Sequence, residues 1–320
     1  MCRTANGYDI NGMKQTKDGR GNICPVTIIL PTLAMEADAD VEKFMTLLDT
    51  KLHEAKDMLI ERFKLIASQS PESAKFMYEN GVMEGYDGKN IVSALKHGTL
   101  AIGQLGLAET LQILVGCDHT QKKGMELAKR IEQLFKDRCA EFKQTYKLNF
   151  GVYFTPAENL CFTAMTKFRE KYGEIPKVSD RKFFTNSIHV PVWVEIDPME
   201  KIDIESQLTG YSSAGCITYI ELPSTAKHNI DALEKIVNYA MDKDIPYFAI
   251  NVPNDTCMDC GYCDEINDKC PMCGGTRIER LRRVTGYLTG NYTTAFNEGK
   301  IQETEMRVKH IKTFPKQKQV

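Results

Sequence analysis

The sequence predicts an α/β fold, in which helices cover a mainly parallel sheet. Two short runs rich in β-branched and aromatic residues, 216–222 and 246–252, flank a segment of helical periodicity at 228–243. This strand–helix–strand order is typical of parallel strands joined by a crossover helix. The 320 residues, 42% of them hydrophobic and 26% charged, are enough to bury a large core in one or two domains.

Charge and cysteine content narrow the class of protein. The formal net charge is −2, so the chain offers no basic surface of the kind that binds nucleic acid. The sequence has neither an apolar run of the ~20 residues that span a bilayer nor the apolar core of a signal peptide. We therefore expect neither nucleic acid nor a membrane as a partner. Eleven cysteines without a secretory signal favour a reducing compartment, the cytoplasm, with metal or thiol chemistry.

The first elements follow from local signals. Residues 1–25 are rich in Gly, Asn and Lys and predict a loop. The β-branched run 23–31 predicts a largely buried strand that ends at a proline. Asp38 or Asp40 can cap the helix that follows, because apolar residues then recur with helical periodicity over about eight turns.

The middle of the chain is predicted to be mainly helical. In 99–111, Gly103 and Gly106 fall in a helical pattern, where each glycine costs up to ~1 kcal/mol relative to alanine. Such a cost is tolerable in a helix that packs closely on another backbone. Residues 120–147 predict a long amphipathic helix with a charged outer face.

A predicted strand at 150–154 leads into a segment with the signature of a helix N-terminus. Thr155 is an N-cap residue type, Pro156 suits the first helical position, and Glu158 completes a capping box. The free N–H groups and the dipole of such a helix start favour a bound anion. The simpler alternative is a well-capped helix without a ligand.

The next segment carries a histidine that we do not assign to chemistry. Residues 183–195 predict a strand in which His189 alternates with apolar neighbours. A lone histidine in a strand is more often a core residue than a ligand, so we interpret His189 as structural. Residues 199–210 then predict a helix, which precedes the strand–helix–strand unit described above.

Four cysteines near the C-terminus have the spacing of a metal site. Two C-x-x-C pairs, separated by nine residues, comprise Cys257, Cys260, Cys270 and Cys273. Such paired turns place four thiolates around one tetrahedral ion, which favours structural Zn²⁺, with an iron–sulfur cluster as the main alternative. Cys263 is left out because the other four cysteines form two matched turns.

A glycine behind this knuckle, Gly286, has two possible roles. An ordinary turn glycine would supply a positive φ angle. Alternatively, Gly286 stores a radical on its Cα atom. An unpaired electron there can delocalise into the flanking amide and carbonyl only when the centre is planar, and glycine alone has no Cβ to crowd that plane.

Matches along most of the chain, all in one order, favour the second role. They are Cys2-Arg3-Thr4, Gly19-Arg20-Gly21-Asn22, KHGTLAIG at 96–103, TPAE at 155–158, TNS at 185–187, HVPV at 189–192, the cysteine knuckle, RVTGYLTG at 283–290, FNEGK at 296–300, Glu303, Arg307 and His310. With these segments the sequence resembles the anaerobic, class III ribonucleoside-triphosphate reductases. The run around Gly286 resembles their C-terminal glycyl-radical segment.

The resemblance implies roles for three residues. Gly286 would store the radical, and Cys2 would be the catalytic thiol that passes its hydrogen to Gly286 and then, as a thiyl, takes the 3′ hydrogen of the ribose. Sulfur suits this relay because the S–H bond is close in strength to the C–H bonds on either side. Asn22 would be an active-site amide that can donate to and accept from ribose hydroxyls. A turn asparagine is the alternative.

The resemblance also implies substrates, cofactors and partners. The segment Thr155, Pro156 and Ala157 would hold the phosphates of a ribonucleoside triphosphate through the backbone amides around Ala157. A radical-SAM activase with an iron–sulfur cluster would generate the glycyl radical from S-adenosylmethionine, and formate would be the reductant. Zinc would be structural and would hold the radical loop in place. Full-length members of this family are expected to be homodimers.

The fold that the resemblance implies is the second half of a ten-stranded α/β barrel, followed by the zinc knuckle and the glycyl-radical loop. Residues 1–252 would form the barrel half, with the central cysteine loop at 1–25, and residues 253–320 the zinc and radical segment. The Cys-Arg-Thr segment lies deep inside longer family members, so we expect a C-terminal half: a fragment, a split-gene product or a truncated frame.

Two other functions compete with ribonucleotide reduction. A different glycyl radical enzyme would keep Gly286 but act on another substrate; the Cys-Arg-Thr loop and the knuckle argue against it. An inactive fragment acting as a zinc-ribbon module that binds another protein would keep the four cysteines and give no role to Cys2 or Gly286.

Overall fold

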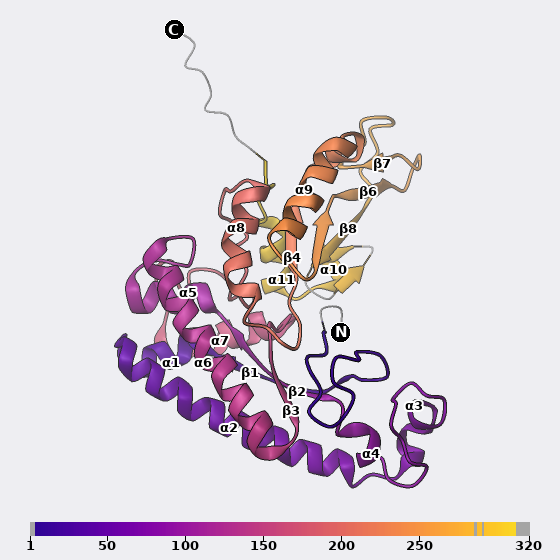
Figure 1. Cartoon of the computed structure of the whole chain (residues 1–320). Coiled ribbons are helices and arrows are strands. Elements are labelled where there is room, and N and C mark those ends of the chain that lie inside the picture. Colours follow the sequence, from indigo (N-terminus) through magenta and orange to yellow (C-terminus); the bar gives the residue numbers. More distant parts are fainter. Residues whose placement is uncertain (1–3, 285–286, 290, 312–320) are drawn as a thin grey trace. The chain divides into compact units, whose positions relative to one another are not determined.

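A computed structural model of the chain describes residues 4–284, 287–289 and 291–311 (Figure 1). The backbone divides into two compact units, which we describe separately. Unit 1 comprises Met1–Ala157, Asn186–Ile188 and Leu208–Cys216, and unit 2 comprises Glu158–Thr185, His189–Gln207 and Ile217–Val320. The functional division expected at residue 252 stays a prediction. In the part of the chain that the structure describes, no helix is long and apolar enough to cross a membrane.

A parallel sheet forms the centre of unit 1. Its strands are β1 (Asn22–Ile29), β2 (Thr99–Leu105) and β3 (Asn149–Tyr153), in the order β1-β2-β3. All seven residues of β2 are buried, as expected for a central strand covered on both faces. The register places Asn22 opposite Thr99 and Thr99 opposite Asn149, so these three residues form one row across the sheet.

The helix predicted over 99–111 is wrong in its first half. Residues 99–105 form strand β2, Gly106 follows with φ +80°, and only then does helix α5 begin at Leu107. Gly103 is explained by the neighbouring segment rather than by a helix. A Cβ atom at this position would lie 1.9 Å from the Thr155 hydroxyl oxygen and 2.4 Å from a backbone carbonyl oxygen.

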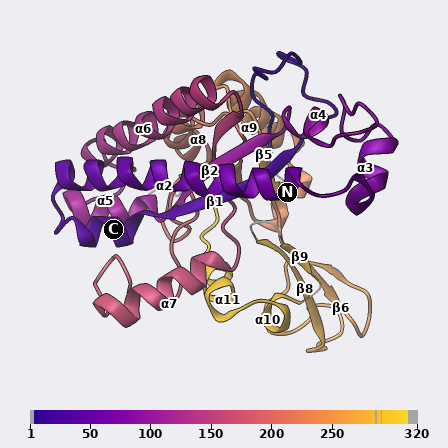
Figure 2. The same cartoon turned by 90° about the horizontal axis from the view of Figure 1, so that it is seen from below.

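Helices cover the sheet of unit 1, and two of them are long. The helix predicted after Asp38 or Asp40 is confirmed, because the Asp40 side chain accepts the Lys43 N–H at 2.7 Å. α2 packs against β1, α6 packs against β3, and the two helices contact each other (Figure 2). The helices of unit 1 are α1 (Leu30–Glu36), α2 (Val41–Ala67), η1 (Pro71–Ala74), α3 (Lys75–Glu79), α4 (Val92–Leu95), α5 (Leu107–Val115) and α6 (Lys122–Tyr146).

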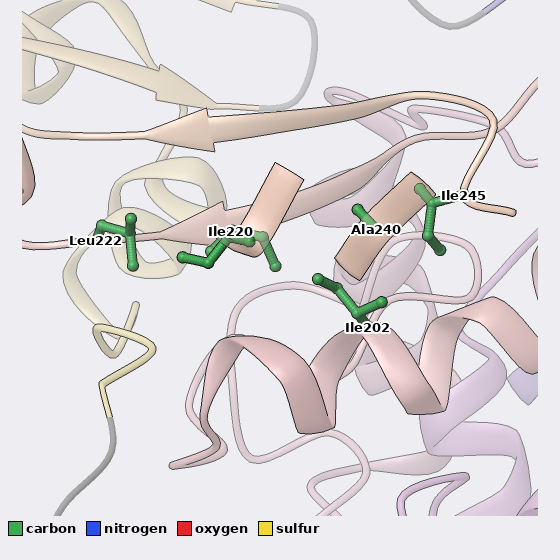
Figure 3. Close-up of a cluster of buried hydrophobic side chains, with 6 residues drawn as sticks. Ile202, Ile220, Leu222, Ala240 and Ile245 are labelled. Carbon is green, nitrogen blue, oxygen red and sulfur yellow. The ribbon is translucent and has the colours of Figure 1, made fainter. Parts of the chain in front are cut away.

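Unit 2 contains the strand–helix–strand unit that the sequence predicts. β4 (Thr218–Glu221) and β5 (Phe248–Asn251) are parallel and are joined through η2 (Ser224–His228) and α9 (Ile230–Asp242). The core beneath them is aliphatic, and Figure 3 shows Ile202 of α8 facing Ile220 of β4 and Ala240 of α9. The other helices before β4 are α7 (Leu160–Tyr172) and α8 (Pro198–Thr209).

The strand predicted at 183–195 does not form, since these residues are loop and turn. His189 is buried, as the interpretation of a structural histidine requires, and its Nδ1 lies 3.5 Å from a carboxylate oxygen of Glu205. Glu205 also accepts the N–H of Val190 at 3.0 Å. This loop is therefore held by polar contacts instead of a strand ladder.

An antiparallel sheet ends unit 2. Its strands are β6 (Asn254–Cys257), β7 (Cys263–Asp264), β8 (Ile278–Val284) and β9 (Tyr287–Thr289), in the order β7-β6-β8-β9. β8 and β9 pair from Arg282 with Thr289 to Val284 with Tyr287, on either side of residues 285–286. Two short helices follow, α10 (Tyr292–Ala295) and α11 (Glu298–Glu305).

Candidate functional site

Two of the predicted catalytic residues, Cys2 and Gly286, lie outside the described residues. The structure does describe the segments next to them. In unit 1 these are the loop 4–21 and the row that begins with Asn22. In unit 2 they are the β8–β9 pairing, the cysteine knuckle that precedes it, and the segment 291–311 that follows it.

Asn22, for which the resemblance implies an active-site role, has a side chain whose polar atoms are buried and unpaired among the described residues. It is the first residue of β1, and both its side-chain Nδ2 and Oδ1 are buried without a hydrogen-bond partner among the described residues. A buried amide left unpaired costs about 1–3 kcal/mol, so such groups are normally matched by a ligand or water. The amide offers both donors and an acceptor, the chemistry that ribose hydroxyls need.

The loop before Asn22 is fastened to the sheet by a buried carboxylate, Asp9. One carboxylate oxygen accepts the Asn149 Nδ2–H at 2.6 Å and the Asn11 N–H at 3.1 Å. The other accepts the His97 Nδ1–H and the Met13 N–H, both at 2.8 Å. Burial would raise the pKa of Asp9, but the hydrogen bonds from Asn149 and His97, and then from the two amides, lower it to about 2.

The capping box predicted at 155–158 is wrong. α7 begins at Leu160, and its N-cap Asn159 makes no side-chain cap hydrogen bond. Ala157 and Glu158 instead take positive φ angles of +50° and +45°. The Thr155 hydroxyl is used elsewhere, since it donates to a backbone carbonyl oxygen at 3.3 Å and accepts from another threonine at 3.1 Å. Thr155–Ala157 is thus a buried loop segment that leads into a turn at residues 158–159, rather than a helix start.

The four predicted cysteine ligands come together in unit 2. The Sγ atoms of Cys257 and Cys273 lie 3.6 Å apart, as do those of Cys260 and Cys270, and all four lie within 4.8 Å of one another. Tetrahedral Zn²⁺ with Zn–S bonds of ~2.3 Å requires sulfur–sulfur distances of about 3.8 Å. The donor set and its spacing therefore fit a fully ligated metal ion that has no open position for a substrate. Cys263 is exposed in β7 and is not part of this cluster.

Local backbone geometry explains how the sequence builds this cluster. Each C-x-x-C pair is followed by a glycine, Gly261 after the first and Gly274 after the second. These glycines have φ angles of +78° and +72°, and their N–H groups donate to the carbonyl oxygens of Cys257 and Cys270 at 2.8 and 2.9 Å. The two turns are therefore near copies, and each directs two thiols to the same point.

A buried chain of charges anchors the segment that follows the β8–β9 pairing. Lys300 contacts Glu303 at 2.5 Å, Arg307 contacts Glu303 at 3.2 Å, and Arg307 also contacts Glu221 of β4 at 3.1 Å. The Lys300 Nζ additionally lies 3.7 Å from the Cys161 Sγ of α7. Burial would raise the pKa of Glu303, but the charges of Lys300 and Arg307 lower it, so the carboxyl group stays ionised.

His310 completes this anchor through the backbone. Its N–H donates to the Glu221 carbonyl oxygen at 2.7 Å, and its Nδ1 accepts the Glu221 N–H at 2.9 Å. Burial, and then the positive charge of Lys201, lower the pKa of His310 to about 3. The ring is therefore neutral and carries its proton on Nε2. Sequence analysis assigned no role to Lys300 or His310. The available signal was the spacing of Lys300, Glu303 and Arg307, at helical intervals of three and four.

Comparisons with known proteins identify the family of the chain. A family model described as anaerobic ribonucleoside-triphosphate reductase matches residues 1–310. The anaerobic ribonucleoside-triphosphate reductase of Escherichia coli (strain K12) is 31% identical over 333 residues, covering 97% of this chain and 45% of the relative. That of Enterobacteria phage T4 is 32% identical over 309 residues, covering 92% and 49%. The chain thus spans about half the length of the curated relatives it matches.

Solved structures support the fold. An anaerobic ribonucleotide reductase superposes with a TM-score of 0.75 at 22% identity, covering 93% of this chain and 46% of that one. The enzyme from Thermotoga maritima, solved in complex with dATP and CTP, superposes with a TM-score of 0.69 at 22% identity, covering 95% and 47%. Because the family model matches residues 1–310 and relatives 31–32% identical cover 92–97% of the chain, the chain belongs to the anaerobic ribonucleoside-triphosphate reductase family.

Proposed function

We propose that the chain carries the radical and thiol chemistry of anaerobic ribonucleotide reduction, in which ribonucleoside triphosphates become 2′-deoxyribonucleoside triphosphates. The observation that supports this most strongly is the amide of Asn22. It is buried without a partner among the described residues, and it stands at the head of β1 directly after the loop that follows Cys2. A structural zinc module would have no reason to leave this amide unpaired.

Three residues would carry the reaction. The radical on Gly286 takes the hydrogen atom of the Cys2 thiol, which leaves a thiyl radical on Cys2. The thiyl takes the 3′ hydrogen of the ribose, and Asn22 holds the hydroxyls while the 2′ hydroxyl departs as water. Formate supplies the two electrons and leaves as carbon dioxide, so each turnover consumes one formate ion and one proton and yields one water molecule.

We propose that the segment Thr155, Pro156 and Ala157 binds the substrate phosphates, although no helix begins there. The support for this proposal is now the backbone turn and no longer a capping box. Ala157 and Glu158 have positive φ angles, and a turn follows at residues 158–159, before α7 begins. Backbone amides in such turns can present N–H groups to an anion.

The remaining partners follow from family membership and from the metal geometry. A radical-SAM activase would form the glycyl radical with S-adenosylmethionine. Zn²⁺, held by the four clustered cysteines, would fix the base of the β8–β9 hairpin and add no chemistry of its own. The barrel half remains a proposal, and its support is the parallel pairing of β1, β2 and β3 in unit 1 and of β4 and β5 in unit 2. We expect a homodimer of the full-length protein, in the cytoplasm.

Product analysis tests this function. The chain, alone and with the remaining segment of a relative supplied in trans, is incubated without oxygen with activase, S-adenosylmethionine, formate and the four ribonucleoside triphosphates. We expect deoxyribonucleotides from the parent, none from Cys2→Ser, and at least tenfold less from Asn22→Ala, while the exposed control Asn80→Ala matches the parent. Undiminished product from Cys2→Ser would refute the role of that thiol. A glycyl radical without any deoxyribonucleotide would favour a different glycyl radical enzyme.

A further inference from the structure

We propose that Asp9 is a positioning residue for this reaction. It fixes the loop 5–20 against the amino ends of β2 and β3 and so sets the place of Asn22 in the row that it shares with Thr99 and Asn149. The inference rests on the proposed function, because it assigns Asp9 to the geometry of that same site. The inference depends on the contacts of Asp9, a residue that neither the composition nor any local motif distinguishes.

Asp9 joins three segments that are far apart in the sequence. Its carboxylate contacts Asn149, the first residue of β3, and His97, two residues before β2. The Asn149 side chain also bonds the loop directly, since its Oδ1 accepts the Ile10 N–H at 3.0 Å. The amino ends of two strands and the loop therefore share a single buried anchor.

The contacts of Asp9 continue to the neighbours of Asn22. The carbonyl oxygen of His97 accepts the Arg20 Nε–H at 2.8 Å, and the carbonyl oxygen of Gly21 accepts the Thr99 N–H at 2.8 Å. Arg20 is buried and also donates through Nη1 to two carbonyl oxygens of the loop, at 2.8 and 2.9 Å. Residues 20 and 21, which precede Asn22, are thus held in place by the segment 97–99. Asp9 holds the same segment through the side chain of His97.

A carboxylate is the only side-chain group that satisfies all the donors at this point. Each oxygen of Asp9 faces two N–H groups, one from a side chain and one from the backbone. An asparagine would turn its own NH₂ toward one of these pairs, whichever way the amide is oriented. Asp9→Asn therefore changes almost no volume yet sets N–H groups against one another, which should displace the loop.

Such a displacement should affect the reaction and not the stored radical. The loop and the Asn22 row belong to unit 1, whereas the β8–β9 hairpin on either side of Gly286 belongs to unit 2. A misplacement of about 1 Å in a catalytic group can cost about a hundredfold in rate. Asp9→Asn should therefore lower deoxyribonucleotide formation by about tenfold to a hundredfold, with the amount of glycyl radical unchanged.

The test compares Asp9→Asn with Asp18→Asn, an exposed aspartate of the same loop. Both are assayed like the parent for the glycyl radical by electron paramagnetic resonance, for release of the 3′ hydrogen from labelled substrate, and for product. We expect an equal radical signal in all three proteins and a loss of hydrogen release and product in Asp9→Asn alone. On the chain alone, hydrogen exchange should rise in residues 5–20 of Asp9→Asn and stay unchanged in α6.

Two further variants keep the proposal falsifiable if Asp9→Asn folds poorly. Asp9→Glu keeps the charge but lengthens the side chain, and should also lose product at full radical content. Asp9→Ala removes all four of these hydrogen bonds without adding a donor, and should likewise lose product at full radical content. Full turnover in Asp9→Asn or Asp9→Glu, or a radical signal that falls in step with product, would overturn the proposal. A parent without radical or product would instead refute the proposed function.

Discussion

The stability of unit 1 should depend on pH through one buried carboxyl group, Glu132 of α6. Its side chain is fully buried, and Oε1 accepts the Gln104 Nε2–H of β2 at 2.8 Å. Among the described residues, Oε2 has no hydrogen-bond partner. Burial raises the pKa of Glu132 to about 8, although the hydrogen bond from Gln104 opposes the shift. Glu132 is therefore mostly neutral at pH 7 in the folded protein.

The sign of the effect follows from the raised pKa. In the unfolded chain Glu132 ionises near pH 4.5, while the folded protein keeps the proton until about pH 8. The stability contributed by the neutral carboxyl is complete below pH 4.5 and is lost as the pH rises toward 8. At ~1.4 kcal/mol per pH unit, the free energy of unfolding of unit 1 should fall by about 4 kcal/mol between pH 5 and pH 8.

Glu132→Gln removes the titratable carboxyl group but keeps the shape of the side chain and the hydrogen bond from Gln104. Urea unfolding of unit 1, followed by hydrogen exchange in β2 and α6, is measured for the parent and the variant at several pH values, and the difference is taken at each pH. We expect the free energy of unfolding of the variant, relative to that of the parent, to rise steadily from pH 5 to pH 8. Above pH 8 this difference should stay constant. Glu126→Gln, an exposed change in the same helix, should give no such slope. A difference between parent and Glu132→Gln that does not change with pH would refute the reasoning.

Further predictions concern the metal, the sheet and the buried charges. Cys273→Ser should lose bound zinc, measured by mass spectrometry of the native protein, whereas Cys263→Ser should retain it; zinc loss from both would place Cys263 among the ligands. Gly103→Ala should strongly destabilise unit 1, because the new Cβ would lie 1.9 Å from an oxygen. The control Gly210→Ala should be tolerated, because its Cβ would meet nothing within 4 Å. Equal melting curves for the two variants would contradict this. Lys300→Met should lower the free energy of unfolding of unit 2 by about 3 kcal/mol, measured by the fluorescence of the single tryptophan. Neutralising Glu303, the carboxylate partner of Lys300, in the same protein should restore part of that loss. No change in either variant would show that the ion pair is dispensable.

Local signals in the sequence were sufficient where the structure is itself local. Asp40 caps α2 by accepting an N–H three residues further on, and the C-x-x-C turns close within four residues. Both patterns depend on neighbours in the chain, so spacing alone identifies them. The strand–helix–strand unit at 216–252 was predicted for a similar reason, because its periodicity changes clearly between strand and helix.

Prediction failed where tertiary contacts decide the local conformation. β2 is buried on both faces, so its residues do not alternate between apolar and polar, and periodicity cannot separate it from a buried helix. Thr155 and Glu158 have the types of a capping box, yet the hydroxyl of Thr155 bonds within unit 1 and Glu158 takes a positive φ. A local pattern is overruled here by the contacts of the strand beside it.

The long-range contacts within each unit have no signature in the sequence. Asp9 meets His97 and Asn149 across 88 and 140 residues, and Arg307 meets Glu221 across 86. Pairings of this kind become visible only once the chain is folded. The roles of Cys2 and Gly286 came from the family resemblance, and both residues lie outside the part of the chain that the structure describes.

The most direct test of the central claim is an electron paramagnetic resonance spectrum of the chain after activation. The protein, alone and with the remaining segment of a relative, is treated without oxygen with activase and S-adenosylmethionine; air is then admitted and the products are weighed. We predict a glycyl doublet, followed by scission of the chain at Gly286. An intact chain without a radical signal that still holds zinc, in a mixture whose activase demonstrably cleaves S-adenosylmethionine, would contradict the claim and leave a zinc-ribbon module.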